Sequence, residues 1–283
     1  MALVPGLFFS GFFDDAAIFP PAGTPMAAAV PAHRALRIRL GGLVGPFVVP
    51  AARIDELLPY ADERAPIDVA VIAAPAELPT AAAKVAAHPG LSLAAVELPV
   101  VAGAVACRAA VHALRDLPDD LPVAVEVPRT EARHAVLDVL ATTRYRAKLR
   151  TGGPAADAFP SADELGAMLH ACVERGIAVK CTAGLQRAIR WTDPATGLAH
   201  HGFLNILLAA AELAYGAPPA VAAGCLRDDY PAGLAAAVRS WTPERGARAR
   251  AIFTSFGACG VAEPVADLVT LGLLAENDRV PAG

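Results

Sequence analysis

The chain has 283 residues, of which 55% are hydrophobic and 18% are charged, and its formal net charge at pH 7 is −4. This composition supplies enough apolar surface for a packed core and argues against intrinsic disorder. The lack of a basic cluster argues against a nucleic acid as the main partner. A chain of this length accommodates one large α/β domain or two small ones.

The apolar opening MALVPGLFFSGFF is too short to span a bilayer, has no basic region before it and lacks a clear cleavage site. We therefore expect no signal peptide and no membrane partner. Five scattered cysteines without a C-x-x-C pair are typical of free thiols in a reducing cytoplasm, and they give no support for a structural zinc site. These cysteines are Cys107, Cys172, Cys181, Cys225 and Cys259.

Short apolar runs that end in turn residues recur along the chain and predict β-strands. A first, weaker run covers residues 6–17. Seven clearer runs follow in chain order, at 43–50, 67–75, 91–99, 121–128, 145–153, 177–185 and 250–260.

Segments with helical periodicity separate most of these runs. The best marked begins at Ser161, has Glu164 three residues later in a capping-box pattern, and ends at Gly176. A longer insert, 186–249, contains two further helical patterns, at 200–216 and 233–241. Other predicted helices cover 51–61, 130–143 and 263–277.

Eight strand–helix units predict a single (β/α)₈ barrel over residues 1–283, with 186–249 as a helical insert between the seventh and eighth strands. The alternative is an open, doubly wound sheet. Two observations disfavour it. No G-x-G-x-x-G follows the first strand, and polar residues recur at the carboxyl ends of the runs, where barrels carry their chemistry.

Only three of the 24 lysines and arginines are lysines, and two of these, Lys148 and Lys180, occupy matching positions in consecutive strands. Because side chains alternate along a strand, both are expected to point into the barrel. Two neighbouring amines repel each other when charged, and desolvation also favours the neutral form, which is a nucleophile or base. Arginine cannot replace lysine in this role, because its guanidinium stays protonated.

Alternation predicts further inward side chains on the strands around these lysines. Glu97 and Glu126 come from the two strands that precede Lys148, and both are candidates for proton transfer. The other residues expected to face inward are Arg146, Arg150, Thr182, Phe253 and Ser255.

The motifs KLRTG (148–152) and VKCTAG (179–184) resemble those of Schiff-base (class I) aldolases of the deoxyribose-phosphate aldolase type. That family carries its Schiff-base lysine on the sixth strand in a K-T-S-T-G pattern. A second lysine lies on its seventh strand in a V-K-x-S-G-G pattern. The resemblance covers roughly forty residues, and the first motif departs from the family at Arg150, where the family has serine.

By this resemblance Lys148 forms the imine and Lys180 lowers its pKa. The family also uses an acidic residue on an earlier strand to shuttle protons through water. Glu97 is the best match for that acid, and Asp14 or Asp15 is a looser match for an acid on the first strand.

Three short glycine-containing turns follow the last three strands, at 150–153, 182–185 and 255–260. Loops after the last strands of a barrel often bind phosphate through backbone N–H groups, although such glycines also suit tight turns. The candidates for contacts with a phosphate or carboxylate are Arg150, Thr151, Gly152, Thr182, Gly184, Ser255 and Gly257.

Two more polar motifs supply candidate site residues. Asp14 and the adjacent Asp15 point in different directions, so at most one is expected to enter the site, and a solvated loop or helix cap remains the alternative. The motif HHGFLN places His200, His201 and Asn205 at the start of a helix near the barrel mouth. We expect His201 and Asn205 to contact substrate there.

The first functional hypothesis is a cytoplasmic lyase of the aldolase type. It would act on a small anionic carbonyl compound or phosphorylated substrate through a Schiff base on Lys148, with Glu97 or Glu126 moving protons and with no cofactor. A homo-oligomer is compatible with this hypothesis, and the sequence does not specify the number of subunits.

Two other hypotheses keep the barrel and change the chemistry. In one, a lysine is the general base beside a metal-bound enolate, with Asp14, Glu97 and Glu126 as metal ligands. In the other, the barrel is a non-catalytic protein whose basic pocket (Lys148, Arg150, Lys180) binds an anionic metabolite.

Overall fold

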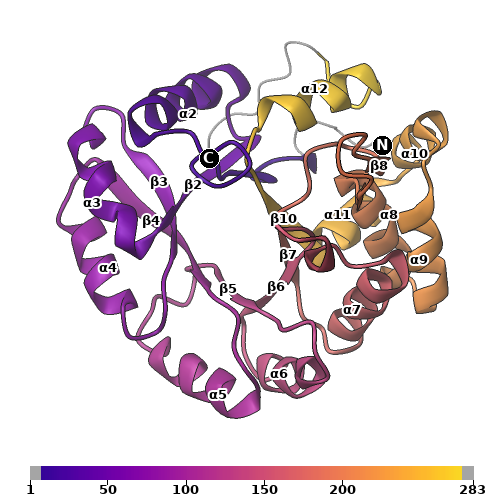
Figure 1. Ribbon diagram of the computed structural model, residues 1–283, viewed down its shortest axis with the longest axis horizontal. Coiled ribbons are helices and arrows are strands. Elements are labelled where there is room, and N and C mark those ends of the chain that lie inside the picture. The colour runs from indigo at the N-terminus through magenta and orange to yellow at the C-terminus, as the bar shows by residue number, and fades with distance from the viewer. Residues whose placement is uncertain (1–7, 276–283) are drawn as a thin grey trace.

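The computed structural model describes residues 8–275, and a closed barrel of eight parallel strands lies at its centre (Figure 1). The predicted (β/α)₈ barrel is confirmed, and the open sheet is excluded because β1 pairs with β10 and closes the ring. In order around the ring, the strands are β1 (Phe13–Asp15), β10 (Phe253–Ala258), β7 (Val179–Thr182), β6 (Arg146–Arg150), β5 (Val123–Glu126), β4 (Leu91–Leu98), β3 (Ile67–Ile72) and β2 (Val44–Pro50).

Helices cover the outside of the ring (Figure 1). The capping box is confirmed at α7, where the Ser161 hydroxyl accepts a hydrogen bond from the backbone N–H of Glu164. The predicted helix at 51–61 is broken, since only α3 is α-helical and 3₁₀ turns flank it. Outside the insert, the helices that cover the ring are α2 (Met26–Leu40), α3 (Ile54–Leu57), α4 (Leu78–Ala86), α5 (Ala104–Ala113), α6 (Ala132–Leu140), α7 (Ala162–Glu174) and α12 (Ala262–Thr270).

The insert between β7 and β10 contains more than helices. It starts with a small antiparallel hairpin, β8 (Trp191–Thr192) and β9 (Ala199–His200), and continues through four helices. The last of these runs to Ile252, so the predicted start of the eighth strand at residue 250 is wrong by three residues. The four helices are α8 (Phe203–Ala214), α9 (Pro219–Arg227), α10 (Pro231–Arg239) and α11 (Pro243–Ile252).

Phe253 packs outside the ring, and its predicted inward orientation is wrong. Its ring centroid lies 5.0 Å from that of Phe12 in an edge-to-face contact, and it stacks near Phe256. The register between β10 and β7 shifts between Phe253 and Ser255, so simple alternation fails at this point. After the shift Ser255 lies opposite Lys180 and faces inward as expected.

Some predictions reach beyond the described residues. Residues 6 and 7 of the first predicted strand, 276 and 277 of the last predicted helix, and the first seven residues of the apolar opening all lie outside them. Within residues 8–275, no helix combines the length and the apolar character that crossing a bilayer requires.

Candidate active site

The two rare lysines lie side by side inside the barrel. Strands β6 and β7 pair so that Lys148 is opposite Lys180, and each residue is only 3% exposed. The sequence prediction that both point inward at neighbouring positions is therefore confirmed. Burying two amines this deeply is costly unless carboxylates compensate their charges.

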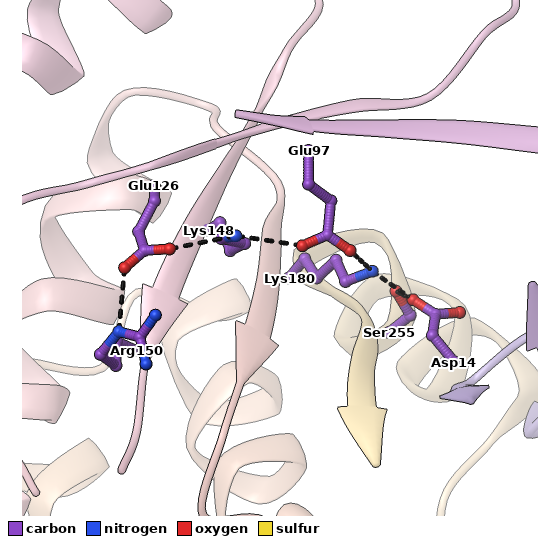
Figure 2. Close-up of polar contacts among 7 residues, drawn as sticks. All are labelled: Asp14, Glu97, Glu126, Lys148, Arg150, Lys180 and Ser255. Atoms are coloured by element: carbon purple, nitrogen blue, oxygen red, sulfur yellow. Dashed lines mark hydrogen bonds and ion pairs between the residues drawn. The ribbon is translucent and has the colours of Figure 1, made fainter. Parts of the chain in front are cut away.

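Carboxylates provide that compensation in a continuous chain of ion pairs (Figure 2). Glu97 lies between the lysines: Lys148 Nζ donates to its Oε2 over 3.1 Å, and Lys180 Nζ donates to its Oε1. Lys148 Nζ also lies 3.0 Å from Glu126 Oε2, and Arg150 Nε donates to Glu126 Oε1 over 2.9 Å. At the other end Lys180 Nζ donates to Asp14 Oδ2 over 2.5 Å.

We refer to Asp14, Glu97, Glu126, Lys148, Arg150 and Lys180 as the lysine–carboxylate network. Three acidic and three basic side chains alternate along it, so each ammonium has two acidic neighbours. The Arg150 side chain, at 41% exposed, is the one that reaches furthest toward solvent. An anion arriving at the carboxyl end of the barrel would meet this guanidinium first.

The pKa values of the network follow from burial and from these charges. Burial alone would raise the pKa of Glu97, but the two ammonium groups outweigh it and lower that pKa from 4.5 to about 2. At Glu126 burial also acts to raise the pKa, but the positive charges of Lys148 and Arg150 outweigh it and the pKa is lowered. For Asp14 burial prevails over Lys180 and the pKa is raised.

The pKa of Lys180 shifts in the direction opposite to the one that the sequence predicted for two amines facing each other directly. Burial would lower its pKa, but Asp14 and Glu97 overcome that effect and raise it. The reason is geometric, since the sequence argument placed no negative charge between the lysines and Glu97 occupies that position. Lys180 is thus held as an ammonium group.

Asp14 enters the site between two residues that face outward, Phe13 and Asp15, as alternation along a strand requires. The register between β1 and β2 shifts between Phe13 and Asp15, and Ser255 Oγ donates to the inward Asp14 Oδ2 over 3.0 Å. A side chain at Gly45 would collide with the Asp14 carboxylate, so glycine is required beside it. The adjacent Asp15 turns away and lies 2.9 Å from His33 Nδ1, as expected if only one of the pair enters the site.

The turns after β6 and β7 are tied to each other. The Thr151 hydroxyl donates to the backbone oxygen of Ala183, and a Cβ on Gly152 would lie 2.9 Å from the Cα of Gly184. Ala183 has a φ of 63°, a left-handed conformation that is uncommon for a residue with a side chain. Thr182 and Gly257 are register partners at the ends of β7 and β10, beside these turns.

His201 and Asn205 are not part of the lysine–carboxylate network. The Asn205 side chain is fully buried, and its amide bonds the backbone of Arg190, Cys225 and Asp228, so it has a structural role in joining loops. His201 is 2% exposed, and its Nε2 lies 2.8 Å from the backbone oxygen of Pro160. The substrate contacts that the sequence predicts for His201 and Asn205 stay a prediction.

The second hypothesis required Asp14, Glu97 and Glu126 to converge on one metal ion. Within the described part of the chain, no group of three His, Cys, Asp or Glu side chains is arranged to hold a metal. Ammonium groups lie between these three carboxylates instead. The residues present therefore do not fit that metal site.

The fold and the site together define a class, a (β/α)₈ barrel with a buried pair of lysines bridged by a glutamate. Comparisons of the chain with protein-family models, with curated proteins and with solved structures found no match. The function must therefore be argued from the residues themselves.

Proposed function

We propose that the protein is a lysine-dependent lyase of the aldolase type, which acts on a small anionic carbonyl compound through a Schiff base on Lys148. The observation that carries the proposal is the position of Lys148 Nζ, 3.1 Å from Glu97 Oε2 and 3.0 Å from Glu126 Oε2. Both carboxylates can accept the proton that the amine must lose before it attacks a carbonyl carbon.

The reaction follows the ordinary course of imine catalysis. Neutral Lys148 adds to the carbonyl carbon, and loss of water gives a protonated imine that withdraws electrons from the neighbouring carbon. Cleavage of the next C–C bond sends its electron pair toward the imine nitrogen and leaves an enamine, while the hydroxyl on the departing carbon loses its proton and that fragment leaves as a carbonyl compound. Protonation and hydrolysis then release the product and restore the lysine. No cofactor is needed for these steps.

The rest of the network supports these steps. Lys180 keeps its charge beside Asp14 and Glu97 and so places a fixed positive charge next to the reacting amine. Arg150, with its exposed guanidinium, can bind the anionic group of the substrate. We place the protein in the cytoplasm, a location supported by five free cysteines.

Borohydride trapping tests the imine directly. The purified protein is incubated with small anionic aldehydes and ketones, reduced with borohydride, digested and analysed by mass spectrometry. We expect a stable adduct on the peptide that contains Lys148, and none on that peptide in Lys148→Arg. Lys84→Arg is the matched control, because Lys84 lies on the surface in an ion pair with Asp55, and it should form the same adduct as the wild type.

A non-catalytic anion-binding barrel is the second candidate, and the partly exposed guanidinium of Arg150 would be its contact with the anion. Arginine in place of either lysine would then retain anion binding, whereas the lyase requires Lys148 itself. A wild type that is active in another assay but forms no adduct on either buried lysine would contradict the Schiff-base proposal.

A further inference from the structure

A polar cavity lies inside the barrel, at the amino-terminal end of the strands. It has a volume of about 170 Å³, and Asp14, Glu97 and Lys180 of the lysine–carboxylate network line its inner end. Gly11 and Pro46 near its rim are at least partly exposed, so solvent reaches it from the amino-terminal side. The remaining lining residues are Ala94, Ala95, Val96, Pro122, Val123, Ala124, Arg146 and Ser255.

Small side chains create this cavity. Barrel interiors are normally filled by layers of bulky branched residues. Here Ala124 occupies an inward position, since its register partners on the adjacent strands are Glu97 and Arg146, and Ala95 lies near it on β4. A space of about 170 Å³ exceeds the roughly 30 Å³ share of one water molecule several-fold. It can hold a small organic molecule.

Arg146 is the charged group of the cavity that lacks a partner of opposite charge. Among residues 8–275, no carboxylate forms an ion pair with it, and its one side-chain hydrogen bond goes to Thr254 Oγ1 over 3.3 Å. Arg150, four residues later on the same strand, has Glu126 at 2.9 Å. Burial lowers the pKa of Arg146 and outweighs the opposite effect of the more distant Asp14 carboxylate. Charges in protein interiors are normally paired.

We propose that this amino-terminal cavity is a binding site for a short monocarboxylate, whose carboxylate pairs with Arg146 and whose apolar tail lies against Ala95 and Ala124. The planar guanidinium matches a carboxylate in a two-bond geometry. Asp14 and Glu97 in the wall disfavour a ligand with two negative charges. The cavity shares Asp14, Glu97 and Lys180 with the network, but its ligand needs no carbonyl carbon and forms no imine.

Isothermal titration calorimetry with butyrate, acetate and inorganic phosphate tests the proposal in a buffer free of other carboxylates. These probes cannot form an imine, so the outcome does not depend on the proposed lyase activity. Butyrate should bind the wild type, acetate should bind more weakly because it buries less apolar surface, and phosphate should bind least. Phosphate binding tighter than butyrate binding, or no butyrate binding at all, would overturn the assignment.

Three variants locate the ligand. Arg146→Met should weaken butyrate binding roughly tenfold or more, because charge-assisted hydrogen bonds are lost. Arg146→Lys, which keeps the positive charge, should bind butyrate more tightly than Arg146→Met and more weakly than the wild type. Ala124→Leu fills the cavity and should exclude butyrate while Arg146 remains. Circular dichroism verifies that each variant is folded.

Arg144→Met is the matched control, since Arg144 lies just before β6 and pairs with Asp119 on the surface. It removes the same charge outside the cavity and should bind butyrate like the wild type. Equal affinity in Arg146→Met and Arg144→Met would show that the carboxylate does not bind at Arg146.

Discussion

The interior of the barrel has two unlike sides. On the side of β2 and β3, Ala16, Val48 and Ala70 form a small apolar cluster that excludes water. On the side of β4, β5, β6 and β7, the lysine–carboxylate network occupies the same interior and ends at Asp14 of β1 (Figure 2). The apolar side is stabilised by burial alone, whereas the charged side is stable only while its charges match. The two sides should therefore respond differently to substitution and to pH.

The largest effect is expected on the charged side, from Glu97→Gln. This change keeps the shape of the side chain but leaves the two buried ammonium groups without their shared carboxylate. Removing one partner of a buried ion pair is strongly destabilising, and we expect the free energy of unfolding to fall by about 3 kcal/mol. Urea unfolding measures it. A loss below about 1 kcal/mol would mean that water compensates the lysines.

The difference in stability between the wild type and Glu97→Gln should depend on pH, and the direction of that dependence can be predicted. Because the pKa of Glu97 is lowered from 4.5 to about 2 on folding, its contribution is fully present above the unfolded pKa and is lost as the pH falls through the folded one. The stability gap between wild type and Glu97→Gln should be constant above pH 5 and close toward pH 2. Urea titrations at successive pH values measure this gap, and a gap that widens in acid would contradict the geometry.

Gly45→Ala should produce a somewhat smaller loss, at the border between the two sides. The new methyl group would collide with the Asp14 carboxylate, which must then move away from Lys180 and Ser255. Overpacking of this kind typically costs about 2 kcal/mol. Gly224→Ala is the control, because nothing lies within 4 Å of the added methyl in helix α9, and alanine should there stabilise by about 0.5–1 kcal/mol.

On the apolar side, Val48→Ala should cost about 1–2 kcal/mol, from the lost burial and the space left behind. Val48 is 3% exposed and packs in a cluster that contains no titratable group. Its effect should therefore stay the same from pH 2 to pH 7, unlike that of Glu97→Gln. If the two variants showed the same pH profile, the division of the interior into two sides would fail.

The sequence was sufficient to predict the barrel and the pairing of the lysines. Both depend on regular features, namely the succession of strands and helices and the alternation of side chains across a strand. Lys148 and Lys180 could be predicted as neighbours because their motifs sit at equivalent points of consecutive strands.

The parts that could not be predicted depend on irregular features. The register shift in β10 turns Phe253 outward, and the close contact of Gly45 with the Asp14 carboxylate accompanies a register shift between β1 and β2. No periodic pattern encodes either. The burial of Asn205 depends on loops distant in the sequence, at Cys225 and Asp228. Glu97 was predicted to face inward, but its position between the lysines follows only from the closed ring.

The smallest loss of stability is expected on substitution of the third lysine, Lys84, which is exposed. Comparing it with the buried network tests whether burial determines the strength of an ion pair. Lys84 Nζ lies 2.7 Å from Asp55 Oδ1, a shorter contact than that between Lys148 and Glu97, but the two side chains are 40% and 66% exposed. Water compensates such a pair, so Lys84→Met should change the free energy of unfolding by less than about 1 kcal/mol, and added salt should reduce the change further. A double-mutant cycle with Asp55→Asn measures the coupling. A coupling as large as the loss in Glu97→Gln would show that contact distance, and not burial, determines the strength of these ion pairs.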